Sequence, residues 1–330
     1  MKGKRTTIRR ILSFLASSVL LFSVLVVSAS AEDKVIKIAG LKGPTSMGLV
    51  QLMEANDSGT AQNRYEFLLA GSADEVTPKL IRGEIDLAAV PANLASVLYN
   101  NTNGAVRVLA VNTLGVLDIV EKNTGITSFS DLKGKTIYAT GKGSTPEYTL
   151  RYLLQENGID PDKDIKIEFK SEPTEVVAIL SLAESGVAML PQPYVTAALG
   201  SVDGLKLAMD LNAVWNETVS ESGLVTGVLV GRSDFLEEAP ETIRSFLDEY
   251  RKSVEWVTEN PAEAAQLIEK FGIAKAAVAE KALPYCNITF LAGDNMHQAL
   301  SGYLEVLFHQ NPKAVGGKLP GEDFYYLLGE

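Results

Sequence analysis

Short apolar runs alternate with segments of helical spacing over the first half of the chain after residue 34. Residues 35–40, 65–70 and 86–90 are typical of buried strands, because each is a brief apolar run bounded by polar or turn residues. Between the first two runs, apolar residues from Leu49 to Met53 predict a helix that Thr45 or Ser46 caps. Such alternation predicts a parallel sheet covered by helices.

The pattern repeats farther along, with strands expected at 135–139, 165–169 and 187–190. In each half a loop of glycine and hydroxyl residues, 43–48 and 141–147, follows a strand and precedes a helix. Such a loop offers unpaired backbone N–H groups and the positive end of the helix dipole. Two such loops predict a polar or anionic ligand held between two halves of the protein.

Two crossings connect the expected halves. The β-like residues 106–111 and 115–120 leave the first half, and 227–231 return to it. Roughly 300 residues exceed what one hydrophobic core usually serves, so two domains are expected. We expect lobe 1 to hold residues 32–120 and 228–330, and lobe 2 to hold residues 121–227.

The first 31 residues have the order of a secretory signal. Five basic residues precede an apolar stretch over 11–27, and Ala29-Ser30-Ala31 supplies small residues before Glu32. This pattern predicts a signal peptide over 1–31 with cleavage after Ala31. An uncleaved membrane anchor is the alternative, because the run approaches the length that a spanning helix needs. Either way we expect the protein in the periplasm or another extracytoplasmic, membrane-associated space.

Charge and cysteine content exclude several classes. Without residues 1–31 the chain has 25 basic and 41 acidic residues, a net charge of −16. This acidity argues against nucleic acid or anionic lipid as a partner. Cys286 is the only cysteine, so the sequence predicts no intramolecular disulfide and no lipid-attachment cysteine. His297 and His309 have no metal-ligand spacing, and no nucleophile or phosphate motif is present, so we expect no metal, cofactor or enzyme activity.

Several motifs in order resemble a known family. They are Asp131-Leu132-Lys133-Gly134-Lys135, the 143–148 segment Gly-Ser-Thr-Pro-Glu-Tyr, the 190–194 segment Leu-Pro-Gln-Pro-Tyr, residues 227–235, and the 315–320 segment Val-Gly-Gly-Lys-Leu-Pro. The mature chain is similar to the extracytoplasmic solute-binding proteins of ABC transporters, in the nitrate, sulfonate, bicarbonate and taurine-like branch. That resemblance implies an α/β, two-lobed periplasmic-binding-protein type II fold. In it each lobe is a mixed, mostly parallel sheet flanked by helices, and two hinge strands join the lobes.

Ligands of open α/β sheets bind beyond the carboxyl ends of the strands. By that rule we expect the ligand-binding residues to be Thr45, Ser46, Met47, Pro91, Asn93, Asn112 and Thr113 on one wall, and Ser144, Thr145, Gln192, Pro193 and Tyr194 on the other. The hydroxyl residues have N-capping as an alternative role. Lys142, Tyr148 and Trp215 are weaker candidates, since a loop lysine is usually solvated and large aromatics usually pack in cores.

The predicted function is capture of a small polar or singly charged organic solute, such as a sulfonate, carboxylate or pyrimidine. Because the expected loops contain no arginine, a doubly charged anion is disfavoured. The resemblance implies an ABC permease and its ATPase as partners, and we expect a monomer. The alternatives are an exported enzyme of the same fold and a ligand-sensing module for a membrane receptor.

Overall fold

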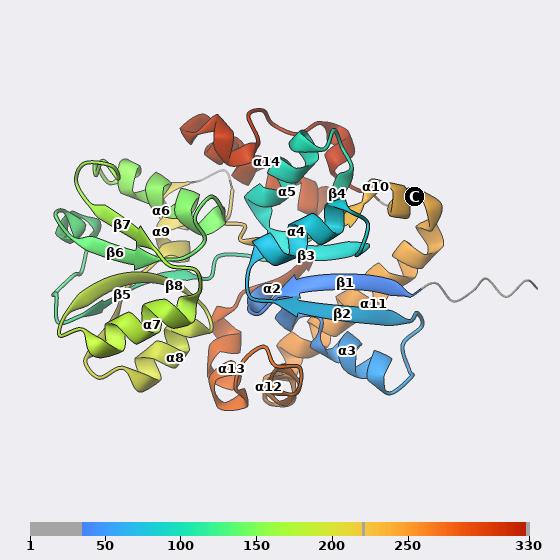
Figure 1. Cartoon of the computed structure of the whole chain (residues 1–330), viewed down its shortest axis with the longest axis horizontal. Helices are drawn as coiled ribbons and strands as arrows, with labels where there is room; N and C mark the ends of the chain where they lie inside the picture. Colours follow the sequence, from blue (N-terminus) through green and yellow to red (C-terminus); the bar gives the residue numbers. More distant parts are fainter. Residues whose placement is uncertain (1–34, 220–221, 328–330) are drawn as a thin grey trace, which may run out of the picture. The chain divides into compact units, whose positions relative to one another are not determined.

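The computed structural model describes residues 35–219 and 222–327, so the predicted signal peptide and its cleavage site lie outside the described residues. Within these residues one mixed sheet has the strand order β11-β4-β10-β3-β1-β2 (Figure 1). Its strands are β1 (Ile36–Leu41), β2 (Tyr65–Ala70), β3 (Leu87–Pro91), β4 (Val106–Thr113), β10 (Gly227–Arg232) and β11 (Ile288–Leu291). Strands β2, β1 and β3 pair in parallel, whereas β10 runs antiparallel between β3 and β4.

A second mixed sheet has the order β7-β6-β8-β5-β9. Its strands are β5 (Leu117–Lys122), β6 (Thr136–Ala139), β7 (Lys166–Phe169), β8 (Gly186–Pro191) and β9 (Leu205–Asp210). Parallel pairing is confined to β7-β6-β8, and β5 is antiparallel to both of its neighbours. The expected α/β class with two mixed sheets is confirmed. Every antiparallel pair contains β4, β5, β9 or β10, the strands that precede or follow a crossing between the sheets.

Helices flank both sheets (Figure 1). They are α2 (Pro44–Met47), α3 (Val50–Asp57), α4 (Ala73–Ile81), α5 (Ala92–Asn101), α6 (Thr145–Glu156), α7 (Pro173–Leu182), α8 (Tyr194–Ser201), α9 (Leu211–Thr218), α10 (Ser233–Glu238), α11 (Pro240–Glu259), α12 (Pro261–Lys270), α13 (Ala276–Ala282) and α14 (Gly293–Gln310). Short 3₁₀ turns are η1 (Phe129–Leu132), η2 (Leu283–Tyr285), η3 (Pro312–Val315) and η4 (Glu322–Phe324). In the part of the chain that is described, none of these helices is both long and apolar enough to cross a bilayer.

Helix starts are where the sequence interpretation was wrong. The sequence predicts a short helix over residues 77–83, opened by Thr77 and Pro78. Helix α4 instead begins at Ala73, because Glu75 accepts hydrogen bonds from the backbone N–H groups of Gly71 and Ser72 and closes a capping box. Thr45 and Ser46 do not cap a helix but lie inside α2, which follows Gly43. Asn93 likewise lies within α5, whose N-cap is Pro91.

An aromatic group in the core joins elements from different parts of the chain. The Trp215 ring on α9 lies 5.1 Å from that of Tyr152 on α6 and 5.4 Å from that of Tyr303 on α14, between ring centroids. Trp215 and Tyr303 are fully buried. The C-terminal helix therefore packs on helices that flank the second sheet.

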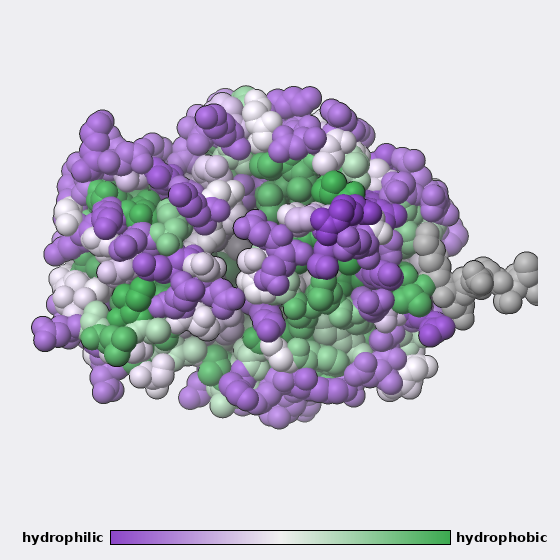
Figure 2. All heavy atoms as spheres, in the orientation of Figure 1, coloured by the Kyte–Doolittle hydropathy of each residue, from purple (hydrophilic) through white to green (hydrophobic). Residues whose placement is uncertain are grey.

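On the face shown in Figure 2, hydrophilic residues dominate, and apolar residues gather over β1 and β2. Strand β2 is an edge of its sheet, and its Leu68 is among the exposed large apolar residues.

Candidate functional site

The first predicted wall forms where β3 and β4 end. Pro91 and Thr113 both pair with Gly227, so the ends of β3 and β4 and the start of β10 lie in one row. Helix α2 lies against this row: the Asn112 Nδ2 donates to the Thr45 carbonyl oxygen at 3.2 Å. A Cβ on residue 227 would lie 2.5 Å from the Thr45 Cγ2, so this close approach requires glycine.

The residues of this wall are buried. Met47, Ser46 and Thr113 are fully buried, and Thr45 is 8% exposed. The Thr113 hydroxyl donates to the Asn112 Oδ1 at 3.1 Å. The structure therefore brings Thr45, Asn112 and Thr113 together, as the sequence predicts, although the two hydroxyl residues of α2 are not caps.

The second wall meets the first at Asn93, which bonds to Thr145 and whose Nδ2 also donates to the Gly143 carbonyl oxygen at 3.5 Å. The Asn93 backbone N–H donates to the Thr145 Oγ1 at 3.4 Å, and the Thr145 hydroxyl donates to the Asn93 Oδ1 at 3.2 Å. The Asn93 Nδ2 also donates to the Ala314 carbonyl oxygen at 2.9 Å. Both side chains are fully buried. Asn93 thus connects the first sheet's helix α5 to the start of helix α6.

Thr145→Val is expected to lower the free energy of unfolding by about 1–3 kcal/mol, because it leaves two buried polar atoms of Asn93 without a partner. Urea unfolding followed by circular dichroism measures this loss. Ser144→Ala is the control, since its hydroxyl is half-buried and donates only to the Gly141 carbonyl oxygen. Equal losses for the two variants would contradict a connecting role for Thr145.

The N-terminus of α6 carries its own acid. Ser144 is the N-cap residue by position, as predicted, but its hydroxyl bonds back to Gly141 and caps no helical N–H. The Glu147 Oε2 accepts from the Gly143 N–H at 2.7 Å, and its Oε1 pairs with Arg151 at 2.8 Å. A carboxylate at this helix start reduces its attraction for an anionic ligand.

Gln192 anchors the other predicted loop. The peptide bond between Gln192 and Pro193 is cis. The Gln192 Oε1 accepts from the Thr196 hydroxyl at 2.8 Å, and its Nε2 donates to the Asp118 Oδ2 at 3.3 Å. Pro193 is buried and Tyr194 is half-buried, and burial together with the charge of Glu172 raises the pKa of Tyr194.

Asp118 is the polar residue that the sequence interpretation missed. It is 8% exposed on β5 and lies opposite Asp210 in the β5–β9 pairing. Burial, reinforced by the charge of Asp210, raises the pKa of Asp118 to about 7. One feature of the sequence could have revealed Asp118: it is a charged residue within the apolar run 116–120. A strand buried on both faces normally has an apolar residue at such a position.

Unpartnered hydroxyls mark the same region. Among the described residues, the Thr45 Oγ1, Ser46 Oγ and Thr226 Oγ1 are buried atoms that make no hydrogen bond. Thr226 precedes Gly227, and its backbone N–H donates to the Thr113 carbonyl oxygen at 3.0 Å. Buried polar groups are normally paired, so these hydroxyls are available to a polar partner.

Comparisons with known proteins agree with this architecture. A model of the NMT1/THI5 like family matches residues 106–264. A binding protein of Brucella abortus is 24% identical over 175 residues, which cover 53% of this chain and 52% of that protein. A nitrate/nitrite binding protein of Nostoc is 25% identical over 49% of this chain and 36% of its own length. The chain thus spans about half the length, or less, of the curated relatives it matches.

Solved structures show the fold of this chain. An ABC transporter protein from Parabacteroides distasonis superposes with a TM-score of 0.73 and 24% identity, covering 88% of this chain and 98% of that one. The periplasmic aliphatic sulphonate binding protein of Escherichia coli gives 0.71 and 18%, covering 88% and 96%. The fold is therefore the type II periplasmic-binding-protein fold, as the sequence resemblance implies.

The weaker candidate residues lie in different parts of the structure. Trp215 is a core residue, and its Nε1 donates to the Ser222 carbonyl oxygen. Lys142 is exposed, and Tyr148 is half-buried against the core. His297 contacts Glu322 and His309 contacts Glu305. Among the described residues, no group of histidine, cysteine or acidic side chains has the arrangement of a metal site.

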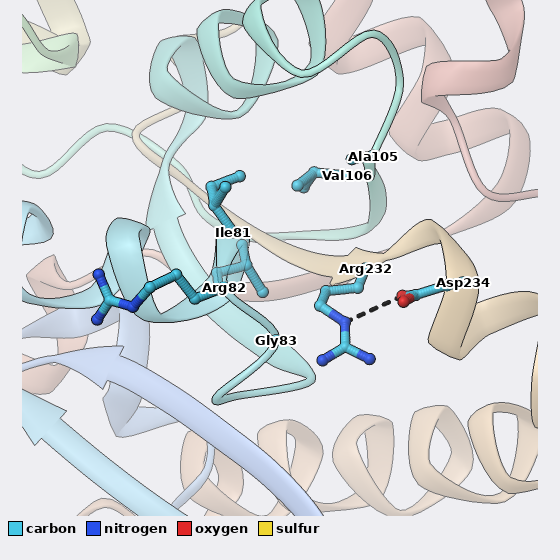
Figure 3. Close-up of a pocket in the computed structure, with 8 residues that line it drawn as sticks. Ile81, Arg82, Gly83, Ala105, Val106, Arg232 and Asp234 are labelled. Carbon is cyan, nitrogen blue, oxygen red and sulfur yellow. Dashed lines mark hydrogen bonds and ion pairs between the residues drawn. The ribbon is translucent and has the colours of Figure 1, made fainter.

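A cavity of about 490 Å³ lies at the opposite ends of the strands from the candidate site, near the starts of β3 and β4 (Figure 3). Its Arg232 pairs with Asp234 at 3.0 Å and with Asp86 at 3.7 Å. In Figure 3 the Arg82 guanidinium points away from Arg232. It forms an ion pair with Glu84. Because both arginines have acidic partners, this cavity offers less to an anion than its composition indicates.

Proposed function

We propose that this chain is the substrate-binding component of an ABC import system and captures a small polar or singly charged organic solute. The observation that carries the proposal is the contact of Asn93 with Thr145. It joins the start of α5, which follows β3 of the first sheet, to the start of α6, which follows β6 of the second. Ligands of open α/β sheets bind at such edges. The names of the relatives and structural neighbours, which are binding proteins and ABC transporter components, support the same function.

The proposed ligand site lies between two lobes joined by the crossing segments. The chain changes sheets between Thr113 and Leu117, and again between Asp210 and Gly227. Because β5 pairs within the second sheet and Gly227 within the first, we propose lobe 1 over 32–116 and 227–330 and lobe 2 over 117–226, a shift of a few residues from the expected bounds, with residues 114–116 as the first hinge. Closure buries the solute between walls that bind it weakly when apart, so the ligand selects the closed state.

The proposed partners are an ABC permease and its ATPase, which receive the solute from the closed form. We propose that residues 1–31 act as a signal peptide that directs export into the periplasm or an equivalent space. We propose that the protein works as a monomer, because one chain holds both walls of the site.

A thermal-shift screen tests this function directly. The purified mature chain is heated with sulfonates, small carboxylates, nitrate, amines and heterocycles, and at least one solute is expected to raise the melting temperature. Binding to the folded state alone raises stability in proportion to RT ln(1 + [L]/Kd). Turnover of a compound without stabilisation by any solute would contradict the proposed function and support an exported enzyme.

A further inference from the structure

We propose that Asp118 binds a positively charged or hydrogen-bond-donating nitrogen group of the solute, so that the site selects an amine-bearing ligand over a simple sulfonate or carboxylate. This inference rests on the proposed function and names the ligand class of the same site. It assigns a specificity role to a residue that the loop pattern does not indicate.

Asp118 lies beside both predicted walls. Asp118 is the second residue of β5, and β5 begins four residues after Thr113 of the first wall. Its neighbour Leu117 pairs with Pro191, which directly precedes Gln192 of the second wall. The side chain of Asp118 therefore lies where the first crossing joins the two predicted walls.

The carboxylate of Asp118 has no cationic partner among the described residues. Within the described residues this carboxylate forms no ion pair with a lysine or arginine, and the one charged group that acts on it is the acid Asp210. Its one hydrogen bond comes from the neutral Gln192 amide, at 3.3 Å. Asp210, opposite it, is an acid whose Oδ1 already accepts from the N–H groups of Asn212 and Ala213. Buried charges are normally paired, so a cationic group is the missing partner.

Two hydroxyl groups near the first wall, those of Thr45 and Thr226, also lack hydrogen-bond partners in the described part of the chain. Thr45 is nine-tenths buried. Thr226 is half-buried, and its hydroxyl oxygen is likewise buried. Both residues flank Gly227, where Asn112 also converges. These hydroxyls can donate to a ligand or accept from it, so the first wall accommodates the hydrogen-bonding groups of a polar solute without adding a charge.

The remaining neighbours of the crossing are amides. The Asn287 Nδ2 donates to the Gly115 carbonyl oxygen, and a Cβ on Gly115 would lie 2.1 Å from the Asn212 Oδ1. The predicted lysine of the site, Lys142, is exposed on its loop, and Glu147 lies at the start of α6. Glu147 is already paired with Arg151, and amides and hydroxyls both donate and accept, so the carboxylate of Asp118 is the group here that favours a ligand donating hydrogen bonds.

Matched ligand pairs test the inference on the mature protein. The pairs are butanoate with 4-aminobutanoate and ethanesulfonate with 2-aminoethanesulfonate, and butylamine serves as a cation without an anionic group. The amine members are expected to raise the melting temperature of the wild type and the amine-free members are not. Equal stabilisation by ethanesulfonate would overturn the inference but leave the proposed function standing.

Asp118→Asn keeps the shape of the side chain and removes the charge. Its affinity for the best amine is expected to fall roughly tenfold to 100-fold in titration calorimetry, the range for a lost hydrogen bond to a charged group. Glu168→Gln is the control, because Glu168 lies on β7 and pairs with Lys170 at 3.7 Å. Unchanged amine affinity in Asp118→Asn, or an equal loss in Glu168→Gln, would overturn the role of Asp118.

The dependence of binding on pH separates a charge effect from a packing effect. Between about pH 8 and about pH 6 the wild-type affinity for butylamine is expected to fall about tenfold, because the carboxylate takes up a proton while the amine stays charged. Asp210 is the other titratable group that acts on Asp118. The Asn variant is expected to show no such change, and a parallel change in both proteins would overturn the inference.

Discussion

Trp215→Ala is expected to lower the free energy of unfolding by about 3–5 kcal/mol, the range for removing a large aromatic side chain from a core. Trp215 is fully buried and contacts the rings of Tyr152 and Tyr303. These three residues come from α9, α6 and α14, so the substitution opens a cavity where separate parts of the chain pack together. The loss therefore affects more than one helix.

Urea unfolding followed by far-ultraviolet circular dichroism measures this effect without depending on tryptophan fluorescence. Trp256→Ala is the matched control, because Trp256 on α11 is only half-buried and its removal is expected to cost less. If Trp215→Ala lost ligand binding with nearly unchanged stability, Trp215 would instead stack on the ligand.

The strands that end at the candidate site were predictable because each is a short apolar run between turn residues. The runs 35–40, 65–70 and 86–90 correspond to β1, β2 and β3 within about a residue at each end. Strand β9 was not predicted. It is an edge strand in which Lys206 and Leu207 are both exposed, so its sequence has no clean alternation of apolar and polar positions.

The site was predictable as a set of loops but not as a set of contacts. The rule that ligands bind beyond strand ends selects Thr45, Asn93 and Thr145, which the structure places in or beside one buried region. It does not say that Asn93 bonds to Thr145, because that contact joins residues 52 positions apart in sequence. Asp118 lies inside a strand, so a rule about loops cannot find it.

Asp118→Asn is expected to stabilise the protein at about pH 8 by up to about 4 kcal/mol, the cost of about three pKa units at 1.36 kcal/mol each. The pKa of Asp118 is raised from 3.8 to about 7, so the folded state holds the proton more tightly than the unfolded state. The favourable contribution of this group is complete below about pH 4 and is lost as the pH rises through about 7. Above that pH the folded wild type holds a buried charge that asparagine does not have.

Urea unfolding at several pH values between about 4 and about 8 measures this difference, which is expected to shrink as the pH falls. Asparagine can still accept the hydrogen bond from Gln192, so the comparison isolates the charge. A variant that is less stable than the wild type at about pH 8 would show that a partner compensates the carboxylate in the free protein. A stabilised variant that also loses amine binding would mean that the protein retains a costly buried charge because the ligand neutralises it, a common relation between stability and binding at functional sites.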